Sequence, residues 1–248
     1  MATTRTPPKT DFQQWKDGVD KAAGDTRWDS WDCEIQRTVS EYNRHLSTTS
    51  GYMPLDWLLI KAMLWVESGA TNSEWNSRPM RIGVSDDPGL TSFLYGNEGG
   101  DLILPPAWKG KITANSARTL PVHNIRAGVG YLLMKMAYYE YRSVLSDDTK
   151  IYEVTTKPGD SLDKIAKAQG STVDILKKLN PTVIALRSGQ VLKYQKASIK
   201  RVIIGWRSFS TMTVALRYNS MQKDSNYAEK LDYALDLVRN GKTIACVH

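Results

Sequence analysis

The chain of 248 residues contains no apolar run long enough to cross a bilayer as a helix, which argues against a membrane-spanning protein. Its amino-terminal sequence, MATTRTPPKTDFQQWKDG, lacks the apolar core of a secretory signal peptide. Histidine is scarce, and His45, His123 and His248 form no cluster of metal-ligand spacing with each other or with the cysteines. We therefore expect no metal site, no cofactor and no membrane partner.

Cysteine is equally scarce. The two residues of this type, Cys33 and Cys246, lie near opposite ends of the chain and could pair. Two isolated thiols are more often buried or free, so we expect them to be unpaired.

Basic residues exceed acidic residues. The chain has 33 Lys and Arg against 26 Asp and Glu, a formal charge of +7 and a pI near 9.3. Such an excess suits an anionic partner, and nucleic acid, a membrane surface and a bacterial cell wall all qualify. The chain has no recognisable basic helix or RNA-binding motif, which argues against nucleic acid.

Helical patterning dominates the first and last parts of the chain. After a flexible lead-in over residues 1–12, apolar periodicity predicts helices over 33–45, 56–68, 125–145, 201–220 and 226–241. Residues 71–121 are rich in Gly, Pro, Asn, Asp and Ser and are expected to be a long irregular region of functional importance.

The pattern of apolar and polar residues changes at Ile151. "IYEVTT" alternates like a strand, "SLDKIAKAQG" and "STVDILKKLN" have the pattern of short capped helices, and "SGQVLKY" offers a closing strand. This small domain is expected to have a core of Leu162, Ile165, Ile175, Leu176, Leu179 and Val191.

The helices that follow total about fifty residues, which is too few to form a stable hydrophobic core of their own. We therefore expect an α+β protein, in which a small βααβ domain (150–198) is inserted into one mainly α-helical domain (1–149 and 199–248).

One carboxylate stands out in the stretch LLIKAMLWVESG. On a helix, Glu67 shares a face with Ile60, Met63 and Leu64, where an ionised carboxylate is poorly solvated. Burial disfavours the charged form and raises a carboxyl pKa, as the general acid of a glycosidase requires.

Four motifs in order resemble the lysozyme-like lytic transglycosylase superfamily, which includes the goose-type lysozymes. The "ESG" at Glu67 ends an apolar helix, and "RPMRIG" (78–83) resembles the substrate-binding Gly-Leu-Met-Gln segment. "NIRAGVGYLL" (124–133) and "ALRYNS" (215–220) resemble the Asn-Ile-x-x-Gly-x-x-Tyr-Leu and Ala-x-x-Tyr-Asn motifs, with "NYAEKL" as the closing helix. The resemblance covers about 30–148 and 200–240 and implies a lysozyme-like domain.

The inserted piece resembles a LysM domain, whose family binds N-acetylglucosamine-containing glycans. The resemblance runs from "YEVTTKPGDSLDKIAKAQGSTVDILKKLNP" to "SGQVLKY", with a shortened loop at 182–187. It implies glycan contacts from two segments, which comprise Gly159, Asp160, Ser161, Leu162, Asn180 and Pro181.

The resemblance implies that Glu67 protonates the leaving oxygen of a β-1,4 MurNAc-GlcNAc bond. In a transglycosylase the same residue then acts as base while the sugar's own 6-hydroxyl attacks, whereas a hydrolase needs a second carboxylate to position water. Asp86 and Asp87 are the close acidic pair of the irregular region and are candidates for that role, or they only cap a turn before Pro88.

The remaining candidates for substrate binding follow from the same motifs. They are Ser68, Met80, Arg81, Tyr131, Tyr218 and Asn219. Arg81 replaces the family's Gln and could meet a lactyl or peptide carboxylate instead. Met80, Tyr131 and Tyr218 could equally be core residues, and Asn219 could serve only the local backbone.

These inferences predict a monomeric peptidoglycan-cleaving glycosidase, a lytic transglycosylase or a muramidase, that binds glycan strands through a LysM domain. The alternatives are a phage endolysin and a catalytically inactive wall-binding protein. We favour a toxin made without a signal peptide and delivered into the periplasm of rival bacteria by a specialised machine such as type VI secretion. That setting implies a cognate periplasmic immunity protein.

Overall fold

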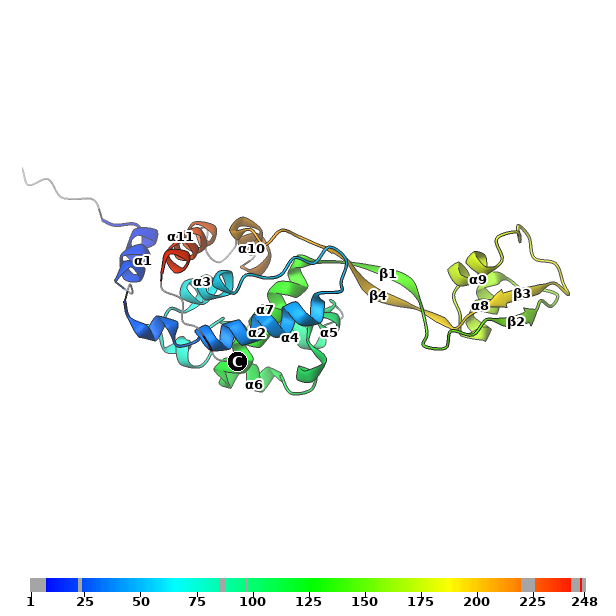
Figure 1. Cartoon of the computed structure of the whole chain (residues 1–248), viewed down its shortest axis with the longest axis horizontal. Coiled ribbons are helices and arrows are strands. Elements are labelled where there is room, and N and C mark those ends of the chain that lie inside the picture. The colour runs from blue at the N-terminus through cyan, green and yellow to red at the C-terminus, as the bar shows by residue number, and fades with distance from the viewer. Residues whose placement is uncertain are drawn as a thin grey trace, which may run out of the picture. The chain divides into compact units, whose positions relative to one another are not determined.

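The computed structural model describes residues 8–21, 24–84, 88–96, 98–219, 226–241 and 246, and shows a mixed fold of helices with small two-stranded sheets (Figure 1). The chain divides into two compact units. Unit 1 combines residues 1–138 with 204–248, and unit 2 comprises residues 139–203. Unit 1 is therefore built from two stretches of sequence that flank unit 2.

Unit 1 is helical. Its α-helices are α1 (Asp11–Asp20), α2 (Asp32–Leu46), α3 (Trp57–Glu67), α4 (Gly89–Tyr95), α5 (Gly100–Ile103), α6 (Ala114–Thr119), α7 (Pro121–Met136), α10 (Thr211–Tyr218) and α11 (Tyr227–Asn240). Three short 3-10 helices, η1 (Thr26–Asp29), η2 (Ser73–Asn76) and η3 (Pro106–Trp108), lie between them. The expected helices at 33–45 and 56–68 are confirmed as α2 and α3, and the expected irregular region contains η2, η3 and α4 to α6.

The core of unit 1 forms around α3 and α7. Both helices are buried over most of their length, and α11 packs along α3 while α2 and α10 pack against α7 (Figure 1). Two glycines permit close approach to α7, because a Cβ at Gly128 would lie 2.6 Å from Met80 and one at Gly130 would lie 2.2 Å from Phe93. This packing brings the segment around Met80 against the middle of α7.

Three predicted boundaries in this part of the chain were wrong. Helix α1 begins at Asp11, inside the predicted lead-in, because Thr10 and Gln13 form a capping box. The helix predicted over 125–145 ends at Met136 and continues as strand β1 (Ala137–Leu145). The helix predicted over 201–220 is strand β4 (Ala197–Trp206) followed by α10.

Strands β1 and β4 pair with each other. The amide of Ser146 donates to Lys196 O at one end of the pair, and the amide of Arg207 donates to Met136 O at the other, so the strands run antiparallel. Strand β1 is rich in Tyr and β4 is rich in Ile and Val, and these residue types favour a pleated surface. These segments are strands rather than helices because they pair with each other across about 50 residues of sequence, which local helical periodicity does not reveal.

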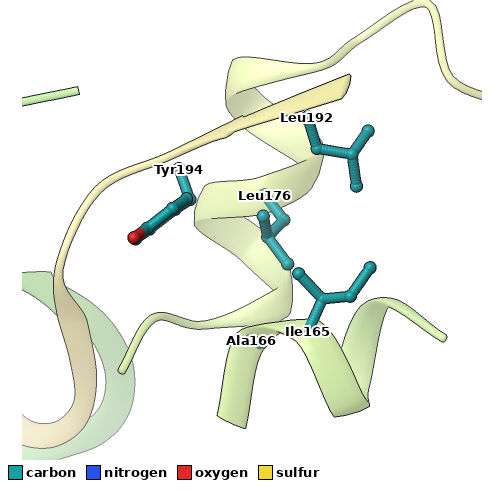
Figure 2. Packing of buried hydrophobic residues seen from close by; sticks show 5 residues of the cluster. All are labelled: Ile165, Ala166, Leu176, Leu192 and Tyr194. Atoms are coloured by element: carbon teal, nitrogen blue, oxygen red, sulfur yellow. The ribbon is translucent and has the colours of Figure 1, made fainter. Parts of the chain in front are cut away.

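The expected strand-helix-helix-strand order of unit 2 is confirmed. Strand β2 (Tyr152–Thr155) pairs antiparallel with β3 (Val191–Tyr194), and α8 (Leu162–Gln169) and α9 (Val173–Leu179) lie between them in sequence. The core contains Ile165, Ala166, Leu176, Leu192 and Tyr194, gathered between β3 and the two helices (Figure 2). Val191 was wrongly assigned to this core, because strand alternation directs Leu192 inward and leaves Val191 53% exposed.

Cys33 and Cys246 form a disulfide, with their Cα atoms 5.4 Å apart, which corrects the expectation of unpaired thiols. The two residues are 213 positions apart in sequence, and only the fold of unit 1 places the first turn of α2 beside the segment after α11. In the described parts of the chain, no helix has both the length and the apolar character needed to cross a membrane.

Candidate functional site

Glu67 is the last residue of α3. Ile60, Met63 and Leu64 on the same helix are fully buried, whereas Glu67 is partly exposed. The helix ends here because Gly69 adopts a positive φ of 65°, and a Cβ at this position would lie 2.8 Å from the ring of Trp28. An apolar helix thus delivers one carboxylate to the edge of the core of unit 1.

The Glu67 carboxylate has a partner on α11. The hydroxyl of Tyr227 donates to Glu67 Oε1 over 2.8 Å, and Tyr227 itself is 3% exposed. A buried donor at this distance holds the carboxyl group in one orientation. Tyr227 was not among the candidates from sequence, although it lies in the NYAEKL segment that resembles the closing helix.

The segment from Pro79 to Ile82 lies beside the end of α3. Ser68 Oγ donates to Pro79 O over 2.9 Å, and Arg81 Nη1 reaches the backbone oxygen of Glu67 at 3.4 Å. Arg81 is exposed and has a φ of +48°, which is uncommon for a residue with a side chain. The structure therefore brings Ser68 and Arg81 to Glu67, with the guanidinium group accessible to solvent.

The buried side chain of Asn124 on α7 fixes the same segment. Its Oδ1 accepts from the Met80 amide at 2.9 Å, and its Nδ2 donates to Ile82 O at 3.0 Å and to Ala117 O at 2.7 Å. Asn124 is 0% exposed, so all three bonds form away from water. The sequence offered a signal for it, a polar residue opening the NIRAGVGYLL stretch, but it was not selected as a candidate.

The side chain of Tyr218 contacts the backbone of Met80. The hydroxyl of Tyr218 donates to Met80 O at 3.0 Å, while the side chain of Met80 is 1% exposed and packs on Gly128. Met80 thus fills the core at this point, and Tyr218 supports the segment that carries Arg81.

The other two motif residues lie close by. The Tyr131 ring meets the Tyr218 ring edge-on with centroids 5.5 Å apart, and Asn219 directly follows α10 as its C-cap. Five of the six predicted substrate-binding residues, Ser68, Met80, Arg81, Tyr131 and Tyr218, are thus linked by contacts around one segment. Asp86 and Asp87 lie outside the described residues.

An ion-pair triad around the buried Lys61 supports α3 six residues before Glu67. Lys61 is 4% exposed, and its Nζ lies 2.6 Å from Asp29 Oδ1 and 2.8 Å from Asp32 Oδ2. Burial raises the pKa of Asp32, and the bond from Lys61 offsets part of this rise. The triad connects α3 to η1 and α2.

A second buried cation supports α7. Arg126 is 2% exposed, pairs with Glu34 and Glu41 on α2, and stacks 4.0 Å from the centroid of the Trp108 ring. His123 lies on the same helix, and burial, followed by the charge of Arg126, lowers the pKa of His123 below its usual 6.5 while Glu34 opposes this.

The lowered pKa of His123 predicts a pH dependence of stability. The unfolded chain binds this proton more tightly, so acidification from pH 7.5 to 5.5 is expected to lower the free energy of unfolding. Urea unfolding at the two pH values should show a smaller loss for His123→Gln than for the unmodified protein. Equal losses in the two proteins would contradict this assignment.

In unit 2, the turn between β2 and α8 carries four of the predicted glycan-binding residues. Gly159 has a φ of +79°, Asp160 Oδ2 accepts from the Lys157 amide at 2.7 Å, and Ser161 caps α8. Leu162 is half-buried against the core of unit 2. Gly159 and Ser161 are exposed to solvent.

Asn180 and Pro181 follow α9. The Asn180 side chain joins α9 to β3, since Nδ2 donates to Lys193 O at 2.7 Å and Oδ1 accepts from the Lys193 amide at 2.9 Å. Pro181 is exposed. Buried Thr156, which sequence analysis did not select, bonds through its hydroxyl to Arg187 O and to the Gln190 amide and ties the strand to the loop before β3.

No curated protein and no solved structure shows a significant match to this chain. The family model described as the LysM domain matches residues 154–194, which begin in β2 and end in β3. Unit 2 therefore contains a LysM domain, and this domain indicates that the protein binds peptidoglycan.

Proposed function

We propose that the protein is a peptidoglycan glycosidase that cleaves the β-1,4 MurNAc-GlcNAc bond with Glu67 as general acid. The observation that carries this proposal is the placement of Glu67, a single carboxylate at the end of a buried helix, held by Tyr227 and bordered by Arg81. The LysM domain supports this proposal, because the peptidoglycan that it binds is also the polymer that Glu67 would cleave.

The chemistry requires two proton transfers, one from Glu67 to the leaving oxygen and one from the attacking hydroxyl back to Glu67. Glu67 donates its proton to the glycosidic oxygen as the bond to the muramyl C1 breaks, which leaves a carboxylate beside a developing positive charge. In a lytic transglycosylase, the 6-hydroxyl of the same sugar attacks C1 and returns its proton to Glu67. In a muramidase, water attacks instead, and Asp86 or Asp87 is the candidate to orient it.

The exposed guanidinium of Arg81 suits this substrate. The muramyl lactyl group and the stem peptide carry carboxylates, which an arginine binds with two parallel hydrogen bonds. We assign Arg81 to recognition of one of these anions.

Charge distribution supports wall binding by unit 2. Residues 139–203 contain 12 Lys and Arg against 7 Asp and Glu, so this unit carries +5 of the total formal charge of +7. Peptidoglycan is polyanionic, and a concentrated positive charge raises the rate at which such a ligand is captured.

Product analysis tests the activity. The purified protein is incubated with bacterial sacculi, and the soluble products are identified by mass spectrometry. Muropeptides with 1,6-anhydro ends identify a transglycosylase, and reducing ends identify a muramidase and direct mutagenesis to Asp86 and Asp87. Absence of Glu67-dependent products from a folded, sacculus-binding protein would refute the proposal.

Tyr227→Phe is expected to lower the rate of muropeptide release by about tenfold, since one hydrogen bond to a charged group is lost. The hydroxyl orients Glu67 Oε1, and the ring that fills the core remains. Tyr233→Phe is the matched control, because Tyr233 lies on the same helix and bonds Asp20 on α1 instead. Equal rates of muropeptide release from the two variants would show that Tyr227 has no role in catalysis.

A non-catalytic wall-binding protein is the second candidate. Arg81 stands where the resembled family has a substrate-contacting Gln, and this departure favours a site that binds without cutting. Product release separates the two, because Glu67→Gln retains sacculus binding in co-sedimentation under both proposals but lowers muropeptide release only under the first.

For the biological setting we propose a delivered antibacterial toxin, with an immunity protein that covers the Glu67 site. The Cys33–Cys246 disulfide supports action in an oxidising compartment such as the bacterial periplasm. Co-expression with the product of a small neighbouring gene that carries a signal sequence should abolish toxicity. A neighbouring holin gene would instead favour the phage endolysin.

A further inference from the structure

The Cys33–Cys246 disulfide joins α2 to a residue that follows α11, the helix that supplies Tyr227. Cys33 is exposed in the first turn of α2, and Cys246 comes six residues after Asn240, the last residue of α11. Resting on the proposed function, we infer that this disulfide is a redox-dependent lock on the Glu67 site, which acts by holding α11 against α3.

Helix α11 connects the disulfide to the Glu67 site. It packs along α3, and five of its side chains are at most 8% exposed, namely Ala228, Leu231, Ala234, Leu235 and Val238. Its first residue, Tyr227, donates to Glu67 Oε1. When α11 leaves α3, Glu67 loses this donor and its carboxyl group becomes solvated.

The disulfide restrains that departure. With the bond closed, Cys246 is anchored to α2, so a released α11 gains little conformational freedom. With the bond open, this covalent restraint is lost, and α11 can open locally at a lower free-energy cost. Besides the packing, Arg239 near the end of α11 makes a 3.2 Å ion pair with Asp56, the N-cap of α3. Both side chains are exposed, so this pair adds little restraint.

The chemistry is a two-electron oxidation. The two thiols lose two protons and two electrons to form the S–S bond, and a disulfide oxidant, either a protein disulfide or oxidised glutathione, is reduced to two thiols in exchange. A reducing cytoplasm keeps the bond open, and an oxidising compartment closes it. The disulfide therefore forms, and α11 is fully stabilised, only after the protein leaves the compartment where it is made.

Hydrogen exchange on the full chain tests the lock without any activity assay. Reduction is expected to speed exchange of the α11 amides by roughly 30-fold or more, which corresponds to the lower end of typical disulfide stabilisation. Amides of α8 and α9 in unit 2 are the internal control and should not respond. In Cys33→Ser/Cys246→Ser, α11 should exchange as in the reduced protein, with or without reductant. Unchanged α11 exchange on reduction would overturn the inference.

Activity against sacculi tests the coupling to Glu67. The temperature at which half of the activity is lost should fall by roughly 5–15 °C on reduction. The loss should precede the loss of helical circular dichroism, because α11 opens before unit 1 unfolds. An identical thermal profile of activity in both redox states, or a loss that coincides with global unfolding, would overturn the lock. Absence of Glu67-dependent products from the oxidised protein would instead refute the proposed function, and the exchange result would still decide whether the disulfide holds α11.

Discussion

Glu67→Gln is expected to lower the rate of muropeptide release by about 10²–10⁴-fold, the usual contribution of a general acid. Glutamine has the size of glutamate and can still accept the 2.8 Å bond from Tyr227, but its amide cannot supply a proton to the glycosidic oxygen. The expected defect is therefore chemical, and the measurement is the initial rate of product release from sacculi at matched protein concentration.

The control for this variant is Glu229→Gln, the same substitution at an exposed position in the first turn of α11. It should release muropeptides at the unmodified rate. Both variants should also co-sediment with sacculi as the parent does, since neither substitution lies in the LysM domain. If Glu67→Gln retained more than about a tenth of the rate, a general acid role would be untenable.

Lys61→Met is expected to lower the free energy of unfolding by about 3–5 kcal/mol, the cost of leaving a buried charge without its partner. Asp32 is 1% exposed and would lose the ammonium group that now lies 2.8 Å from its carboxylate. The variant should also lose activity, because the helix that ends at Glu67 is tied to α2 and η1 through Lys61. Urea unfolding at pH 7 measures the effect.

The pH dependence of this variant gives a sharper test. Without Lys61 the pKa of Asp32, already raised by burial, rises further, so the folded state binds a proton more tightly than the unfolded chain. Acidification from pH 7 to 5 should therefore narrow the difference in stability between Lys61→Met and the unmodified protein, and Lys61→Met/Asp32→Asn should be more stable than the single variant at pH 7. Lys109→Met, at an exposed site, should change stability by less than about 0.5 kcal/mol. A difference from the unmodified protein that stays the same or widens on acidification would contradict the assigned role of the triad.

The LysM domain could be predicted from sequence because its signals are local. A turn glycine at Gly159, the caps Ser161 and Thr172, and the stop at Gly170 each act within a few residues of the chain. The error at Val191 arose because alternation along a four-residue strand does not say which of its two faces meets the helices.

Strands β1 and β4 could not be predicted in this way. Residues 137–145 follow α7 without a Pro or Gly to mark its end, and their apolar residues fit a helical period as well as a strand. Only the pairing of the two segments satisfies their backbone groups as strands, and that pairing skips the whole LysM domain.

The sequence by itself determined the α+β class, the βααβ order of the LysM domain and the position of Glu67 at the end of an apolar helix, since each depends on residues close together in the chain. Tertiary structure alone decided the partners of Glu67. Tyr227 reaches it from 160 residues away, Asn124 orders the segment of Arg81 from another helix, and Cys33 pairs with Cys246 across 213 positions. Such contacts depend on how helices pack, and local patterns of apolar and polar residues specify which face a helix buries but not which side chain it meets there.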